Sequence, residues 1–369
     1  MLYTTSSAKS EGAKRSHFFA RINGLSLLLC LACSAATPEA GRGNLSHPGQ
    51  RSGYVAGQGG VRLFYRVEGS GPDTVVVLHG GPGLNLEGIR PDLSPLAERH
   101  AVLYFDQRGA GRSERPEQLR LTAAAMVEDL EAIRRVFRLE RLTLLGHSWG
   151  GAYAVLYAAR YPERVGRLIL VGSVPPVPHP YFDQYVTNQT ARHDSATNAR
   201  LQRLFRMQEV ARDPVRVCRE QFGLAIRALT ATPDLAERVR GDLCAGTPAN
   251  VRGMEPLLRQ VWASLTADGD PEGLYDFRPL ALRILAPTLV VHGAEDPMPL
   301  PGSAEWARAF PRGRLVVIPD AGHFPHAERP EQFFSAVETF LAGGGTTGGL
   351  SHRLGSAIPG RDHSFIQAK

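Results

Sequence analysis

Short apolar runs alternate with amphipathic helical patterns through most of the chain. The runs are rich in valine, leucine and isoleucine, and they lack the polar alternation of a strand with one face in water. They predict buried strands near residues 74–79, 101–106, 142–147, 168–173, 287–292 and 314–318, after an opening hairpin over residues 54–67. The intervening patterns predict helices at residues 122–139, 303–310 and 331–341. This alternation is typical of an α/β fold, in which helices cover both faces of a mostly parallel sheet.

The gap between the strands near 168–173 and 287–292 is too long for a loop. Its apolar positions predict helices at residues 200–211, 214–227 and 251–265. We therefore expect residues 53–174 and 286–342 to form the α/β core. Residues 175–285 should form an inserted helical cap that controls access to a site.

The two ends of the chain fall outside this pattern. Residues 1–36 have the order of a secretory signal, in which basic residues precede an apolar stretch, here residues 25–32, and small residues follow it. The stretch is too short for a membrane span, which needs about 20 residues. We expect residues 37–52 to be a linker and the glycine-rich residues 343–369 to be a disordered tail.

Cys33 stands where a bacterial lipoprotein would be cleaved and acylated. The preceding residues resemble such a site, although Cys30 occupies a position that usually carries leucine. Ordinary cleavage after Ser34 or Ala36 is the alternative. The sequence therefore predicts export, either to the periplasm or to a membrane through a lipid on Cys33.

Composition is that of a globular enzyme. The chain has 369 residues, of which 43% are hydrophobic and 21% charged, enough for one large domain with an insertion. The formal net charge of +6 comes from scattered arginines rather than from a basic stripe, so we expect no nucleic-acid partner. The sequence shows neither a metal-ligand cluster nor a dinucleotide fingerprint, so we expect neither a metal nor a cofactor. It does not indicate an oligomeric state.

The segment Gly146-His147-Ser148-Trp149-Gly150 is a G-x-S-x-G pattern between a predicted strand and a helical pattern. In this context a sharp turn exposes the serine as a nucleophile at the sheet edge. A chance match in a chain with 39 glycines is the alternative, but the flanking strand and helix favour catalysis by Ser148.

The segment His79-Gly80-Gly81-Pro82-Gly83 follows another predicted strand. A glycine-rich loop lets backbone N–H groups approach a ligand, and an oxyanion hole uses one such group plus the N–H of the residue after the nucleophile. We assign these donors to Gly81 and Trp149. His79 lies inside the turn, so we expect it to orient the loop with Gly80 and Gly83 rather than to act as the base.

Asp296 and His323 follow the last two predicted strands, in the chain order serine, acid, histidine. Loops at the carboxyl ends of parallel strands share one edge of the sheet, where such folds build their sites. We expect His323 to be the general base and Asp296 to orient it. The competing residues are Glu295 and Asp320 for the acid, and His292 and His326 for the base. His326 precedes a predicted surface helix and is expected to be solvated.

Taken together, these segments resemble α/β-hydrolases of the proline iminopeptidase type, the S33 peptidase-like group. The matching set also includes Asp106-Gln107-Arg108-Gly109-Ala110-Gly111-Arg112-Ser113 and spans roughly residues 53–342. The resemblance implies a serine hydrolase that works through an acyl-enzyme without a cofactor, on small peptides. For Asp106 we expect a structural role in a tight turn. A non-catalytic binding protein of the same fold is a remote alternative.

The cap departs from the resemblance. Proline iminopeptidases bind the substrate amine with cap carboxylates and carry a tryptophan-rich helix that ends in glutamate. Here Trp262 stands alone, and Glu209, Glu220 and Glu255 are the candidate amine anchors, each more typical of a solvated helix charge. An esterase or lactonase acting on small acyl compounds therefore remains the alternative to an aminopeptidase.

Two cysteines, Cys218 and Cys244, lie within the expected cap. An exported chain meets an oxidising environment, where two thiols in one small subdomain can pair. We expect a disulfide between them; two buried thiols are the alternative.

Overall fold

The computed structural model describes residues 51–117, 120–208, 211–266 and 275–343. The signal expected at residues 1–36, including Cys33, lies outside the described residues. So do most of the linker and the tail beyond Gly343. In the described part of the chain, no helix is both long and apolar enough to cross a membrane.

Eight strands of the described chain form one sheet in the order β1-β2-β4-β3-β5-β6-β7-β8. β1 and β2 form the antiparallel opening hairpin, β2 also pairs antiparallel with β4, and the remaining pairs are parallel. This mixed but mostly parallel sheet confirms the predicted α/β fold class. The strands are β1 (Arg51–Ala56), β2 (Arg62–Glu68), β3 (Thr74–Leu78), β4 (Ala101–Phe105), β5 (Leu142–His147), β6 (Val165–Val171), β7 (Thr288–Gly293) and β8 (Gly313–Ile318).

The strand order reverses around β3, and the candidate site lies at this reversal. From β3 the chain runs to β4 on one side, then returns to β5 on the other. Leu78 at the end of β3 pairs with Gly146 near the end of β5. The loop after β3 and the turn after β5 therefore lie side by side at the carboxyl edge, where open α/β sheets bind their ligands.

Both faces of the central strands β3 to β7 are buried, which explains their continuous apolar runs. The expectation of a buried strand near residues 314–318 was wrong, because β8 is the edge strand of the sheet and only Ile318 in it is buried. Val76 and Leu78 belong to one hydrophobic cluster, whereas Val75 and Val77 belong to another, because successive side chains of a strand point to opposite faces. The first cluster includes residues of α2 (Ala123–Val136), α3 (Trp149–Arg160) and α10 (Leu300–Ala309); the second includes residues of α1 (Arg90–Leu93) and α12 (Pro330–Leu341).

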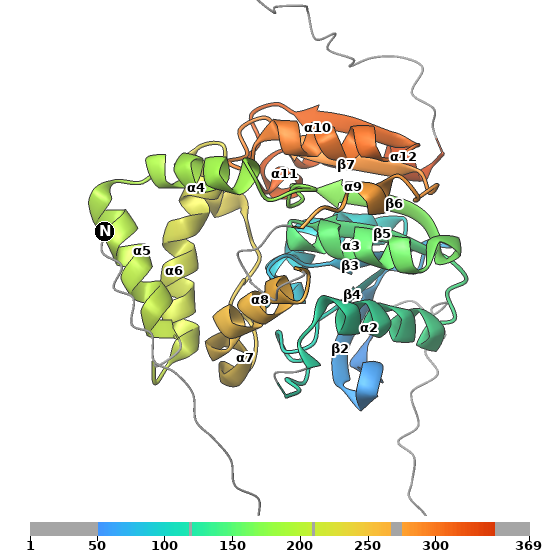
Figure 1. Cartoon of the computed structure of the whole chain (residues 1–369), viewed down its shortest axis with the longest axis horizontal. Helices are drawn as coiled ribbons and strands as arrows, with labels where there is room; N and C mark the ends of the chain where they lie inside the picture. Colours follow the sequence, from blue (N-terminus) through green and yellow to red (C-terminus); the bar gives the residue numbers. More distant parts are fainter. Residues whose placement is uncertain (1–50, 118–119, 209–210, 267–274, 344–369) are drawn as a thin grey trace, which may run out of the picture. The chain divides into compact units, whose positions relative to one another are not determined.

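The segment between β6 and β7 carries the cap helices, which form a group of their own beside the strands (Figure 1). The sequence prediction missed α4 and placed one helix over residues 251–265, where the structure has α7 and α8. Gly253 divides them. Pro256 lies in the first turn of α8, where backbone N–H groups have no acceptor within the helix, so a proline costs no hydrogen bond there. The cap helices are α4 (Tyr181–Ala191), α5 (Ser195–Gln208), α6 (Pro214–Leu229), α7 (Pro248–Arg252) and α8 (Met254–Ala263).

A disulfide joins Cys218 of α6 to Cys244, with a Cα–Cα distance of 5.9 Å. Both residues are buried, and they pack with Val251 of α7 in a small apolar cluster of the cap. The bridge therefore fixes α6 against the segment that leads into α7.

We predict that the double variant Cys218→Ser/Cys244→Ser loses about 3 kcal/mol of unfolding free energy. The bridge closes a loop with a sequence separation of 26, and in the chain-entropy description such a loop restricts the unfolded state by about this amount. Urea unfolding of the two proteins measures the difference. Mass spectrometry of the non-reduced protein provides the control, and two thiols that alkylate without reduction would contradict the pairing.

Candidate active site

Ser148 stands in a strained turn between β5 and α3. Its φ of 55° lies in the left-handed region, which side-chain-bearing residues rarely adopt. The turn requires close backbone packing, since a Cβ on Gly146 would lie 2.2 Å from the Gly150 carbonyl oxygen, and one on Gly150 would lie 2.1 Å from that of Leu78. The Ser148 N–H donates to the Val171 carbonyl oxygen at 2.9 Å, which ties the turn to the end of β6. The fold therefore overdetermines the backbone conformation of Ser148.

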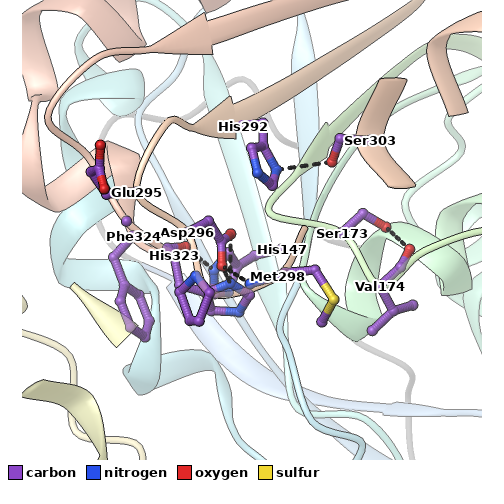
Figure 2. Close-up of polar contacts among 12 residues, drawn as sticks. His147, Ser173, Val174, His292, Glu295, Asp296, Met298, Ser303, His323 and Phe324 are labelled. Carbon is purple, nitrogen blue, oxygen red and sulfur yellow. Dashed lines mark hydrogen bonds and ion pairs between the residues drawn. The ribbon is translucent and has the colours of Figure 1, made fainter. Parts of the chain in front are cut away.

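Asp296 and His323 are brought together from the ends of β7 and β8. The His323 Nδ1–H faces both carboxylate oxygens of Asp296, at 2.9 Å and 3.1 Å (Figure 2). Asp296 also accepts the Met298 N–H at 2.8 Å. Burial lowers the pKa of His323, but the carboxylates of Asp296 and Glu328 together raise it by more, so the net pKa lies above the ordinary value. Burial raises the pKa of Asp296, but His323, His292 and the Met298 N–H together lower it by more, so the net pKa lies below the ordinary value.

The serine turn and the acid–histidine pair meet at the end of β6. A Cβ on Gly172 would lie 3.2 Å from both Asp296 Oδ2 and His323 Nδ1. His147, next to Ser148, donates from Nε2 to the His323 carbonyl oxygen at 2.9 Å, and the two rings lie 4.8 Å apart (Figure 2). The three sequence-predicted residues thus converge on one edge of the sheet.

The glycine-rich loop after β3 abuts Ser148. A Cβ on Gly80 would lie 3.2 Å from the Ser148 Cβ, and Gly81 and Gly83 have φ values of 117° and 101°, which only glycine adopts readily. The N–H of Trp149 is the first of α3 and so has no acceptor within the helix. Both N–H groups assigned to an oxyanion hole therefore belong to segments that border the serine.

His79 is part of the scaffold of this loop. Its Nδ1–H donates to the Gly80 carbonyl oxygen at 2.9 Å, and its Nε2 accepts the Gln107 N–H at 3.1 Å. Burial lowers the pKa of His79 to about 4, so the ring is neutral at physiological pH.

Gln107 also lies at the site. The sequence indicated no role for it, although it belongs to the segment from Asp106 to Ser113. Its amide donates to the His79 carbonyl oxygen at 2.9 Å, and its Oε1 accepts the Trp149 indole N–H at 3.2 Å. One buried side chain therefore connects the glycine-rich loop with Trp149, the residue after Ser148.

Asp106 occupies the turn expected of it. Its carboxylate accepts the N–H groups of Leu86 and Arg112, each at 2.7 Å, and it is 2% exposed. Burial raises the pKa of Asp106 to about 7 despite these donors. Arg108 in the same loop forms a buried ion pair with Asp129 at 2.6 Å. The loop is thus held by buried polar contacts on both sides.

The alternative candidates for the acid and the base lie in other environments. Glu295 and Asp320 are exposed, and His292 Nδ1 lies 2.9 Å from the Ser303 hydroxyl (Figure 2). The expectation that His326 is solvated was wrong: it is 2% exposed, and its ring nitrogens have no hydrogen-bond partner within the described chain. The short helix α11 (Pro325–Glu328) turns inward, so the His326 ring packs against Phe333.

The cap reaches the site through aromatic side chains. Although no second tryptophan lies near it in the sequence, Trp262 of α8 has its ring edge-on to Trp149 at 5.1 Å and stacked on Tyr275 at 5.4 Å. Sequence spacing gave no sign of this contact between the cap and Trp149, the residue that follows Ser148.

The candidate amine anchors are bound to arginines. Glu220 pairs with Arg200, and Glu255 pairs with Arg259 one turn along α8. Glu209 lies outside the described residues. Within the described ranges, no group of histidine, cysteine and carboxylate side chains is arranged to hold a metal ion.

Comparison with known proteins shows one fold and several activities. A family described as alpha/beta hydrolase fold matches residues 73–330. Proline iminopeptidase of Heyndrickxia coagulans is 25% identical over 294 residues, which cover 78% of this chain and 98% of that protein. A 2-hydroxymuconate semialdehyde hydrolase of Pseudomonas sp. strain CF600 is 28% identical over 290 residues, 77% of this chain and 91% of that protein. The structure of a thermophilic esterase from Thermogutta terrifontis superposes with a TM-score of 0.57 at 25% identity, covering 79% of this chain and 98% of that one.

We predict that Gly172→Ala slows the reaction of Ser148 with a fluorophosphonate by roughly tenfold or more. Alanine at a φ of 49° is strained, and its Cβ would displace the acid–histidine pair, where small misplacements are costly. The measurement is the second-order labelling rate. Gly223→Ala on α6 is the matched control, since nothing lies within 4 Å of its Cβ and labelling should not change. Equal labelling rates for the two variants would contradict the prediction.

Proposed function

The chain belongs to the α/β-hydrolase fold family, and from this premise we propose that it is a serine hydrolase that works through an acyl-enzyme. One observation carries the proposal: the buried Asp296–His323 pair beside the strained turn of Ser148. A free serine hydroxyl is a weak nucleophile and needs an adjacent base, and the base needs a group that fixes its tautomer. These residues supply all three roles.

In the proposed reaction, the Ser148 Oγ attacks an acyl carbonyl while His323 Nε2 takes the hydroxyl proton. Asp296 keeps the other imidazole proton on Nδ1 and stabilises the imidazolium. The tetrahedral oxyanion receives hydrogen bonds from the N–H groups of Gly81 and Trp149. His323 then returns its proton to the leaving group as the acyl carbon–heteroatom bond breaks. A water molecule then gives a proton to the same histidine and attacks the acyl carbon. The bond from that carbon to Ser148 Oγ breaks, Oγ takes the proton back from His323, and the acid is released.

For the substrate, we propose first a short peptide cleaved at its amino-terminal residue. The support is the proline iminopeptidase that aligns with 78% of this chain and is itself covered to 98%. The second candidate is a small ester or lactone. It is supported by the pairing of Glu220 and Glu255 with arginines, which neutralises two carboxylates that could otherwise hold a substrate amine.

We also propose that the enzyme acts outside the cytoplasm. The order of basic, apolar and small residues at the start of the sequence supports this location. The Cys218–Cys244 disulfide agrees with it, because such bonds persist in oxidising compartments. Attachment through a lipid on Cys33 is part of the same proposal.

We predict that a fluorophosphonate labels Ser148, and that Ser148→Ala abolishes both labelling and turnover. The substrate panel should compare prolyl and alanyl arylamides with short-chain nitrophenyl esters. Preferred turnover of a prolyl arylamide would support the aminopeptidase, and preferred ester turnover the esterase. Ser148→Ala is the blank for every substrate. Undiminished turnover in this variant would refute the serine mechanism.

We predict that kcat/KM rises with pH through a midpoint above 6.5. Only neutral His323 can accept the proton, and its pKa lies above this ordinary value because of Asp296. His79 and His147 do not explain this rise of kcat/KM with pH, since burial lowers their pKa values to about 4 and about 3. Asp296→Asn should lower the midpoint in addition to slowing turnover. Activity that stays level down to pH 5 in a folded protein would contradict a histidine base.

A further inference from the structure

The loop that carries His323 is held on both sides by one buried carboxylate. Glu328, at the end of α11, is 0% exposed. Its Oε2 accepts the Gly322 N–H at 2.9 Å, and its Oε1 accepts the Phe324 N–H at 3.0 Å. The residues on either side of His323 are therefore bound to the same side chain.

The same carboxylate binds the cap. Glu328 Oε2 also accepts the N–H of Ala231, just beyond α6, at 2.7 Å. Two residues earlier, the Leu229 carbonyl oxygen accepts the N–H of His323 at 2.7 Å. The cap segment Leu229–Ala231 thus donates one hydrogen bond to Glu328 and accepts another from the His323 loop.

The cap segment Leu229–Ala231 packs directly against the backbone of the His323 loop. A Cβ on Gly322 would lie 2.4 Å from the Leu229 carbonyl oxygen and 2.8 Å from the Ala231 nitrogen. Arg192, at the end of α4, donates to the carbonyl oxygens of Ala228 and Thr230 and also to that of Glu295. The cap therefore contacts both the loop of the base and the loop of Asp296.

We propose that Glu328 is a positioning residue that seats the His323 loop against the end of cap helix α6. The base then takes its working position only with this cap segment in place. The inference rests on the proposed function, since it assumes that His323 is the base. It assigns Glu328 no contact with the substrate.

The arrangement is specific for a carboxylate. Each of the three donors to Glu328 is a backbone N–H, so an ionised side chain with two acceptor oxygens matches them. A glutamine has one acceptor oxygen and an NH₂ group, which would face at least one of these N–H groups. A buried N–H left without an acceptor is costly, and the loop would shift to relieve it.

The charge of Glu328 also acts on the base. In the described chain, the ionisable groups that act on His323 are Asp296 from the β7 loop, His292 from β7, His147 from β5, and Glu328 and His326 from α11. Of these, the two carboxylates favour the protonated imidazole, although burial opposes it. Loss of the Glu328 charge should therefore lower the pH midpoint of activity, an effect that a purely structural residue would not produce.

The test compares Glu328→Gln with Glu131→Gln in the full-length protein. Glu131 is a matched control: it is 3% exposed, and it accepts hydrogen bonds from Arg134, Arg135 and Tyr157 on α2 and α3, away from the His323 loop. We expect Glu328→Gln to reduce the rate of fluorophosphonate labelling by roughly 10- to 100-fold relative to the control. The pH midpoint of labelling should fall in Glu328→Gln and remain unchanged in Glu131→Gln. Glu328→Asp, which keeps the charge, should restore the midpoint but only part of the rate.

Gly322→Ala tests the same contact independently, should Glu328→Gln fail to fold. It keeps the carboxylate but adds a Cβ against Leu229, so labelling should slow while the pH midpoint stays near that of the unaltered protein. Wild-type labelling rates in folded Glu328→Gln or in Gly322→Ala would overturn the proposal.

Ser148→Ala and His323→Ala, measured alongside, separate the two hypotheses. If either retains labelling or turnover, the proposed function fails. If both are inactive and Glu328→Gln behaves like Glu131→Gln, only the role of Glu328 fails.

Discussion

The hydrogen bond between His323 and Asp296 joins the two loops that complete the site. It is buried, so neither side chain can exchange its partner for water, and an unpaired charge at this depth would be costly. Its geometry is possible because β7 and β8 are adjacent parallel strands whose carboxyl ends share an edge. The position of β6 beside β7 then brings the serine turn to the same edge, through the bond from Ser148 to Val171.

Buried polar contacts, rather than apolar packing alone, shape the other half of the site. His79 and Gln107 fix the glycine-rich loop and connect it to Trp149, while Asp106 holds the turn behind them. Such networks specify one arrangement because each unmade bond costs free energy in a region that water does not reach. The loop that borders Ser148 is therefore held in place by side chains of the protein itself.

The cap contacts the residues of the site directly. Trp262 packs on Trp149, and the segment after α6 bonds to the loop of His323. The disulfide at Cys218 lies on the same helix α6 whose far end contacts this loop. In this chain the inserted cap is thus attached directly to the residues expected to perform the chemistry.

The sequence by itself predicted the central parallel strands, because strands buried on both faces must be continuously apolar. It also indicated Ser148, Asp296 and His323 as candidates, since a strand, a tight turn and a helix leave a local pattern. The tertiary structure alone decided the burial of His326, the link from Gln107 to Trp149, the contact of Trp262 and the bond from Ala231 to Glu328. The last bond joins residues 97 positions apart, and the bond from Gln107 spans 42. Periodicity and motifs report the neighbours of a residue along the chain, whereas these contacts depend on which distant segments the packed sheet and cap bring together.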